Sequence, residues 1–196
     1  MSLKTQFTDE PFFAKLRHRA YGFMKIIEHV EGLSRQFSTF TILETGCCRI
    51  KDNWWGDGQS TRIWDWVAQK VPGVRAMSID ITLEFIEMSK EMTTKVEYIH
   101  SDSIKALNNL DSDTLGRVGL LYLDSYDWSE EIALDSAFHH LAELTSVWRY
   151  LPPGCMIVVD DRHDTFKGKH TMVQMFMEKL GIEPVFAEYQ IAWIKP

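Results

Sequence analysis

Three aspartates follow two apolar segments of the sequence, in a pattern that suits a hard cation. Asp124 comes directly after the apolar run Val118–Leu123, and Asp160 and Asp161 come directly after the apolar run 155–159. Carboxylates that gather at one place repel one another and are costly without a cation. A divalent ion such as Mg²⁺ prefers oxygen ligands and would relieve this repulsion. The pattern predicts a metal site at these aspartates; in the alternative, only one faces a cleft and the others cap loops.

Asp80 suggests a different chemistry, the binding of a nucleotide. It ends the β-rich run 74–80, and an acidic residue at that place is suited to bind the two hydroxyls of an adenosine ribose. Gly46 follows an earlier run over 40–44 and permits a tight turn with close approach of a ligand to backbone N–H groups. The interval between Gly46 and Asp80 exceeds the usual value of about 20 residues, and an insertion over 49–56 accounts for the excess. The alternative for Asp80 is a solvent-facing strand end.

Two further segments carry polar residues beside predicted helices. Gly58, Ser60 and Thr61 precede or open a helix, where free N–H groups suit a carboxylate or phosphate. The segment is neither a G-x-G-x-x-G fingerprint nor a P-loop, and a plain loop with a capped helix explains it equally well. Asp102 and Ser103 follow the run 96–100. They are expected to hydrogen-bond an adenine amino group, to cap the next helix, or to do both.

The elements that must position these side chains alternate along the chain. Strands are predicted over 40–44, 74–80, 96–100, 118–123 and 155–159, with helices over 61–70, 83–92, 104–110, 131–150 and 168–180. The runs 183–189 and 191–195 are joined tightly, so they must be antiparallel. This order predicts an α/β fold: a Rossmann-like doubly wound sheet of about seven strands, mostly parallel with a C-terminal antiparallel hairpin, and helices on both faces. Ligands of such sheets bind at the carboxyl ends of the strands.

The length fits one domain over residues 1–196. Apolar residues over 12–30 recur at helical spacing, so residues 1–37 are expected to form an N-terminal helical extension.

Composition restricts the kind of partner and the compartment. The formal net charge of −7 and the pI near 5.5 argue against broad binding to nucleic acid or anionic membranes. The cysteines Cys47, Cys48 and Cys155 form no disulfide framework, which indicates a reducing compartment. The sequence has no signal peptide pattern and no apolar run near the roughly 20 residues needed to span a bilayer. A cytoplasmic protein with a small-molecule partner is expected, and its aromatic residues would support a homodimer.

Taken in order, these motifs resemble the class I S-adenosylmethionine-dependent methyltransferases. The resemblance covers about residues 38–196 and rests on the segments 41–46, 56–61, 78–80, 101–103, 121–127 and 154–161. More narrowly, the segments 122–127 and 158–161 are similar to the metal-dependent branch that includes catechol-type and macrolide or sugar O-methyltransferases. The insertion over 48–55 departs from the family pattern and would reshape the pocket for the methionine part of the cofactor.

The resemblance implies roles for particular residues. Glu44 and Gly46 would line the methionine part of S-adenosylmethionine, Asp80 would hold the ribose, and Asp102 with Ser103 would hold the adenine. Together with the neighbouring loop residues, the expected cofactor-binding set is Glu44, Gly46, Cys47, Gly58, Ser60, Thr61, Asp80, Ile81, Asp102, Ser103 and Asp124.

The resemblance also implies a catalytic set. Asp124, Asp160 and Asp161 match the ligands of the metal-dependent members, in which the metal binds substrate oxygens and lowers the pKa of a hydroxyl. The catechol-type members have a lysine three residues after the first metal aspartate, where this chain has Asp127. The expected catalytic residues are Asp124, Asp127 and His163, with Asp127 or His163 as the base.

The leading functional expectation is O-methyl transfer to a small hydroxylated acceptor, assisted by Mg²⁺ or a similar divalent cation. A non-catalytic cofactor-binding or interaction module with the same fold is the main alternative. An NAD-dependent oxidoreductase would share the ribose-binding aspartate, but the G-x-G-x-x-G fingerprint is missing. The N-terminal helix and the insertion over 49–55 are expected to wall the acceptor site.

Overall fold

The computed structural model describes residues 1–56, 59–162 and 168–196, and a seven-stranded sheet runs through them. Its strands are β1 (Phe40–Thr45), β2 (Val74–Asp80), β3 (Val96–His100), β4 (Val118–Leu123), β5 (Met156–Val159), β6 (Phe186–Ala187) and β7 (Ile191–Ile194). The order across the sheet is β3-β2-β1-β4-β5-β7-β6. Strands β1 to β5 pair in parallel, and β7 pairs antiparallel with both β5 and β6. The predicted fold is therefore confirmed.

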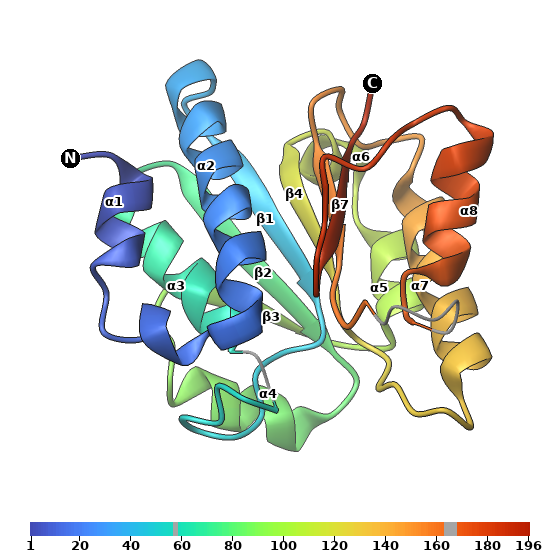
Figure 1. Cartoon of the computed structure of the whole chain (residues 1–196), viewed down its shortest axis with the longest axis horizontal. Helices are drawn as coiled ribbons and strands as arrows, with labels where there is room; N and C mark the ends of the chain where they lie inside the picture. Colours follow the sequence, from blue (N-terminus) through green and yellow to red (C-terminus); the bar gives the residue numbers. More distant parts are fainter. Residues whose placement is uncertain (57–58, 163–167) are drawn as a thin grey trace.

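Helices cover both faces of the sheet (Figure 1). One face carries α1 (Leu3–Thr8), α2 (Ala20–Gln36) and α3 (Ser60–Lys70), and the other carries α5 (Ser103–Asn109), α7 (Ala133–Val147) and α8 (Thr171–Lys179). Helix α4 (Leu83–Lys90) contacts β2 and β3, and the short α6 (Ser112–Leu115) precedes β4. Among the described residues, no helix has the length and apolarity needed to cross a membrane.

The single helix predicted over 12–30 is wrong in its first part. The structure has two 3₁₀ turns there, η1 (Phe13–Lys15) and η2 (Arg17–Arg19), and α2 begins only at Ala20. Arg17 has a φ of +51°, which interrupts an α-helix. Leu16 is nevertheless buried, as the apolar spacing requires.

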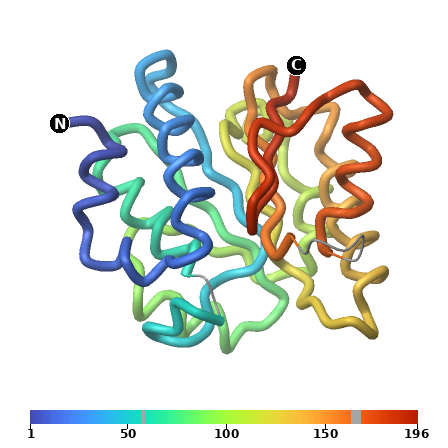
Figure 2. The backbone as a smooth tube through the Cα atoms, in the orientation of Figure 1, coloured from blue at the N-terminus to red at the C-terminus, as the bar shows by residue number. Residues whose placement is uncertain are grey.

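Consecutive residues of the central strands enter two separate cores. Ile42 and Tyr122 pack with the α2–α3 layer, and Leu43 and Leu121 pack with the α7–α8 layer. Both strands are buried along their whole length, and β4 reads as a continuous apolar run in the sequence because both of its faces are covered. The backbone trace shows that the parallel strands β1, β2, β4 and β5 all end at the same end of the sheet (Figure 2).

Candidate functional site

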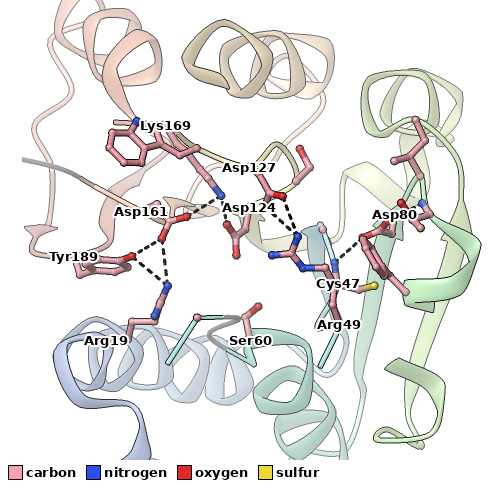
Figure 3. A pocket seen from close by; sticks show the side chains of 17 residues that line it. Arg19, Cys47, Arg49, Ser60, Asp80, Asp124, Asp127, Asp161, Lys169 and Tyr189 are labelled. Carbon is pink, nitrogen blue, oxygen red and sulfur yellow. Dashed lines mark hydrogen bonds and ion pairs between the residues drawn. The ribbon is translucent and has the colours of Figure 1, made fainter. Parts of the chain in front are cut away.

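The carboxyl ends of the central strands surround a cavity of about 600 Å³ (Figure 3). A smaller cavity of about 260 Å³ adjoins it, and both are lined by Gly46, Asp80, Ile81 and Ser125. The strand order reverses between the neighbouring strands β1 and β4, because the chain runs from β1 to the edge strand β3 and then returns to β4. Open α/β sheets bind their ligands at such a switch point, so the cavities lie where the fold predicts a site.

Gly46 lets the loop after β1 pass close to the end of β4. Its φ is +84°, and its N–H donates to the carbonyl of Ile79 at 2.8 Å. A Cβ atom at this position would lie 2.6 Å from the carbonyl oxygen of Asp124. Only glycine fits this conformation and this approach without a shift of the backbone.

Asp80 lies where the two cavities meet. Its carboxylate accepts the N–H of Cys47 at 3.1 Å and the N–H of Thr82 at 2.7 Å, one on each oxygen. Each carboxylate oxygen can accept a second hydrogen bond, so Asp80 can still bind two hydroxyl groups. Its neighbour Ile81 is 67% exposed and lines both cavities, which places an apolar side chain at the opening.

Glu44 and Thr61 lie behind the cavity wall instead of lining it. Glu44 is fully buried and accepts hydrogen bonds from Thr61 at 2.7 Å, Trp64 at 2.8 Å and Ser78 at 2.8 Å. Burial raises the pKa of Glu44 to about 7. Thr61 in turn accepts the N–H of Cys48 at 2.9 Å. These bonds tie α3 to β1, β2 and the loop after β1, so both residues support the cavity indirectly.

The smaller cavity is lined by Asp102, Ser103 and His139. Asp102 caps α5 by accepting the N–H of Lys105 at 2.9 Å, so the predicted capping role is present in a residue that also faces the cavity. Ser103 Oγ lies 3.0 Å from His139 Nε2, which lies 3.4 Å from Glu143 Oε1. Burial lowers the pKa of His139, but Glu143 outweighs this and the net pKa is raised.

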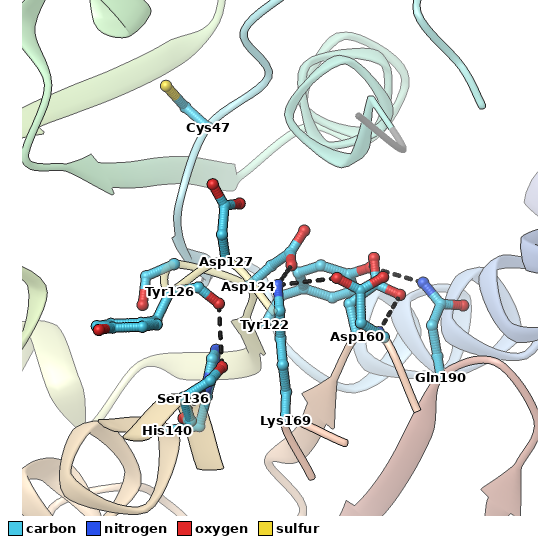
Figure 4. Close-up of polar contacts among 12 residues, drawn as sticks. Cys47, Tyr122, Asp124, Tyr126, Asp127, Ser136, His140, Asp160, Lys169 and Gln190 are labelled. Atoms are coloured by element: carbon cyan, nitrogen blue, oxygen red, sulfur yellow. Dashed lines mark hydrogen bonds and ion pairs between the residues drawn. The ribbon is translucent and has the colours of Figure 1, made fainter. Parts of the chain in front are cut away.

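The three predicted carboxylates do meet at the ends of β4 and β5, and two buried cations meet them. Figure 3 shows Asp124 and Asp161 with Lys169 and Arg19, and Figure 4 shows Asp124 and Asp160 with Lys169. The Lys169 ammonium lies 2.5 Å from Asp124 Oδ1 and 3.0 Å from Asp161 Oδ2. The Arg19 guanidinium lies 3.4 Å from Asp160 and 3.2 Å from Asp161. The side chains of Lys169 and Arg19 are only 2% and 4% exposed. We call these five residues the carboxylate cluster.

The charges of the cluster stabilise one another. Burial lowers the pKa of Lys169, but Asp124 and Asp161 raise it by more, so the lysine is held in its charged form. Burial raises the pKa of Asp161, but Lys169, Tyr189 and Arg19 outweigh it and keep that pKa below its usual range. Asp124 and Asp160 have pKa values raised by burial.

Asp160 faces the protein interior and not the cavity. Its side chain accepts the hydroxyl of Tyr122 at 2.8 Å and the N–H of Asp161 at 2.9 Å, and Gln190 donates to the same tyrosine at 2.6 Å. Asp160 is fully buried. It therefore holds Arg19 and links β5 to β4 and β7.

Solved methyltransferases share this architecture. The MycE methyltransferase from the mycinamycin biosynthetic pathway, in complex with Mg and SAH, aligns with a TM-score of 0.61 and 13% identity over 96% of this chain and 55% of its own. A TehB-like SAM-dependent methyltransferase from Corynebacterium glutamicum aligns with a TM-score of 0.50 and 13% identity over 93% of this chain and 98% of its own. The chain has the fold of class I S-adenosylmethionine-dependent methyltransferases.

A ribosomal protein L11 methylase from Lactobacillus delbrueckii subsp. bulgaricus shares the methyltransferase fold, with a TM-score of 0.50 and 13% identity over 86% of this chain and 76% of its own. The chain spans 55% of the length of the MycE chain. The sequence matches no family model and no curated protein. The fold is thus shared at low sequence identity.

The carboxylate cluster of this methyltransferase fold does not fit the predicted metal site. Among the described residues, no three His, Cys, Asp or Glu side chains form a group that could hold a metal ion. Asp124 and Asp161 are bridged by the Lys169 ammonium, which lies between them where a divalent ion would have to bind. Asp160 is engaged by Tyr122 and Arg19. The predicted metal ligands are instead the anionic half of an ion-pair cluster.

The other predicted residues divide into three groups. Cys47 and Ser60 line the larger cavity, and burial raises the pKa of the Cys47 thiol. Asp127 also lines it, but its side chain is 70% exposed and pairs with Arg49 at 3.0 Å. Gly58 and His163 lie outside the described residues.

Sequence reasoning missed Arg19, Lys169 and Tyr189, which all line the larger cavity. Arg19 lies within the predicted N-terminal extension, Lys169 within a short basic stretch, and Tyr189 between the last two strands. The Tyr189 hydroxyl donates to Asp161 at 2.6 Å, and Arg19 stacks 4.4 Å from the centre of the Tyr189 ring. The only signal in the sequence was the excess of carboxylates, which require cations from elsewhere in the chain.

Proposed function

We propose that this protein transfers a methyl group from S-adenosylmethionine to a hydroxyl group of a small-molecule acceptor. The observation that carries the proposal is the pair of adjoining cavities that meet at Asp80. The smaller cavity, of about 260 Å³, suits an adenine ring, and Asp80 can accept the two ribose hydroxyls. The larger cavity, of about 600 Å³, leaves room for the methionine part and an acceptor.

The cofactor would be held mainly at the Asp80 side of the larger cavity. Gly46 exposes backbone at the switch point, and Ile81 offers an apolar surface at the opening. Asp102 and Ser103 line the adenine-sized cavity and supply hydrogen-bonding groups to it. Figure 3 shows Asp80 and Cys47 on one side of the larger cavity and Lys169, Asp161, Tyr189 and Arg19 on the other. We call the latter four residues the acceptor end.

When bound, S-adenosylmethionine supplies a methyl group that its sulfonium already activates. The residues of the chain then have to align the acceptor and take up its proton. Asp124 lines the cavity beside the acceptor end and is the carboxylate we assign as the base. The acceptor O–H bond breaks and its proton passes to Asp124. An electron pair of the acceptor oxygen forms the new bond to the methyl carbon, and the electron pair of the broken C–S bond stays on sulfur. Asp127 and His163 are the alternative bases.

The proposed reaction proceeds without Mg²⁺. The Lys169 ammonium already bridges Asp124 and Asp161, so a metal ion cannot bind between these two carboxylates while the lysine is in place. In the place of a metal ion, the positively charged side chains of the carboxylate cluster would lower the pKa of the acceptor hydroxyl.

Calorimetric binding of S-adenosylhomocysteine is the first test. Wild type is expected to bind with a Kd in the micromolar range, and Asp80→Ala is expected to lose most of that affinity. Asp135→Ala, an exposed aspartate on α7, serves as the matched control and should bind as wild type does. Absence of binding to wild type would overturn the proposal. Binding without methyl transfer across a broad panel of hydroxylated acceptors would favour a non-catalytic cofactor-binding module.

A further inference from the structure

The Lys169 ammonium joins carboxylates from two different strand ends. It lies 2.5 Å from Asp124, which follows β4, and 3.0 Å from Asp161, which follows β5. The lysine precedes α8 and is 2% exposed, yet it lines the larger cavity. A buried charge that contacts a ligand cavity is expensive unless it has paired partners, and Lys169 has two.

We propose that Lys169 is the built-in cation of the acceptor site: its ammonium occupies the place of a divalent metal ion and stabilises the acceptor oxygen as it loses its proton. The second half of this inference rests on the proposed function, because it needs an acceptor in the cavity. The first half, the exclusion of a divalent ion, depends on the geometry of the chain only.

The number of donors on Lys169 supports this assignment. A lysine ammonium has three N–H donors, and Asp124 and Asp161 take two of them. The third can reach an acceptor oxygen in the cavity that Lys169 lines. A fixed donor aimed at developing negative charge in a water-poor site stabilises a transition state strongly, because it needs no reorganisation during the reaction.

The surroundings hold the ammonium in this position. Asp161 is oriented by the Tyr189 hydroxyl at 2.6 Å and by Arg19 at 3.2 Å, so it cannot turn away easily. Arg19 also places a second positive charge beside Asp160 and Asp161. A divalent ion would have to displace Lys169 and approach Arg19 against like-charge repulsion.

Binding of Mn²⁺, followed by the loss of its free-ion electron paramagnetic resonance signal, tests the first half without any cofactor. Wild type, Lys169→Arg and the control Lys179→Met, an exposed lysine at the end of α8, are expected to show no site tighter than about 1 mM, since a lysine or arginine cation fills the position. Lys169→Met frees two carboxylates and is expected to bind Mn²⁺ about tenfold more tightly or better.

Tight Mn²⁺ binding by wild type that is lost in Asp161→Asn would overturn the inference. So would a folded Lys169→Met variant that binds Mn²⁺ no better than wild type. If Lys169→Met does not fold, as judged by circular dichroism, the wild-type and Lys169→Arg titrations still test the inference. A Mn²⁺ site tighter than about 1 mM in either protein would overturn it. Binding of S-adenosylhomocysteine is measured on the same samples, so that failure of the cofactor to bind is recognised separately from the Mn²⁺ result.

Once an acceptor is found, the second half has its own readout. Lys169→Met should lower kcat far more than KM, because the ammonium acts on charge that develops during the reaction, and Lys169→Arg should restore part of kcat. Chelator should leave the wild-type rate unchanged. An unchanged kcat in Lys169→Met, or loss of wild-type activity with chelator, would overturn this half.

Discussion

Asp124 and Lys169 lie 45 residues apart in the sequence, and the lysine ammonium donates to the aspartate carboxylate at 2.5 Å. The pair connects the end of β4 to the segment before α8 and closes one side of the larger cavity. Its partners Asp161 and Arg19 extend the contact to β5 and to the N-terminal segment. The carboxylate cluster is thereby built from four parts of the chain.

Replacement of Gly46 by alanine should both destabilise the fold and block the proposed cofactor site. Gly46 has a φ of +84°, and a Cβ there would meet Asp124 at 2.6 Å. Gly154→Ala is the matched control, because its φ is +85° with no atom near the added Cβ. Both should lose about 1–2 kcal/mol from backbone strain, as measured by urea unfolding. Gly46→Ala should lose more stability than Gly154→Ala, and it alone should lose S-adenosylhomocysteine binding. Equal losses of stability and binding in the two variants would contradict the steric argument.

Asp102 and Asp111 form a natural pair for testing the smaller cavity. Both cap a helix, Asp102 through the N–H of Lys105 at 2.9 Å and Asp111 through the N–H of Thr114 at 2.7 Å. Each change to alanine should cost about 1 kcal/mol of stability. Only Asp102 lines the cavity, so only Asp102→Ala should also weaken S-adenosylhomocysteine binding in calorimetry. Equal binding by the two variants would restrict Asp102 to capping.

The stability of the protein should depend on pH through Glu44. Its pKa is raised by burial to about 7 in the folded state, against an ordinary value of 4.5. The folded state therefore keeps a proton that the unfolded state loses as the pH rises from 4.5 to 7. The resulting stabilisation is fully present below pH 4.5 and falls by about 1.4 kcal/mol per pH unit until pH 7.

Urea unfolding of wild type and Glu44→Gln at pH 5, 6 and 7 measures this effect. The unfolding free energy of wild type should fall relative to that of Glu44→Gln as the pH rises. Parallel pH profiles would show that Glu44 titrates at an ordinary pKa.

Arg19 should matter for stability as well as for the site. Arg19→Met leaves the buried Asp160 without its cation, and breaking a buried pair in this way costs about 3–5 kcal/mol. The double variant Arg19→Met with Asp160→Asn should recover part of this loss, because no uncompensated charge remains. Arg35→Met, which breaks an exposed pair with Glu31, should change stability little. Urea unfolding compares the variants, and a double variant as unstable as Arg19→Met would refute the charge argument.

The alternation of apolar runs in the sequence was sufficient to predict the sheet. Strands β2, β3 and β4 begin and end where the sequence predicts. The signal is clearest for β4, because a strand covered on both faces is buried and apolar throughout. The pattern was weaker at the ends of the chain. The strand predicted over 183–189 is only Phe186–Ala187, and two 3₁₀ turns replace the start of the predicted helix over 12–30.

The strand ends also indicated the site, since parallel strands bring their carboxyl ends to one edge. Asp80, Asp124 and Asp161 accordingly line one cavity. The sequence could not show that Glu44 turns into the core, because the direction of a side chain at a strand end depends on what packs against it.

What only the tertiary structure decided is which cations meet the carboxylates. Arg19 and Lys169 are separated by most of the chain, and neither has a local pattern that marks it as buried. Long side chains find their partners through the packing of whole segments. Here the N-terminal turns contact the turn between β6 and β7, and the residues before α8 contact the end of β5. The excess of aspartates required a positive charge, and the fold supplied it from within the chain.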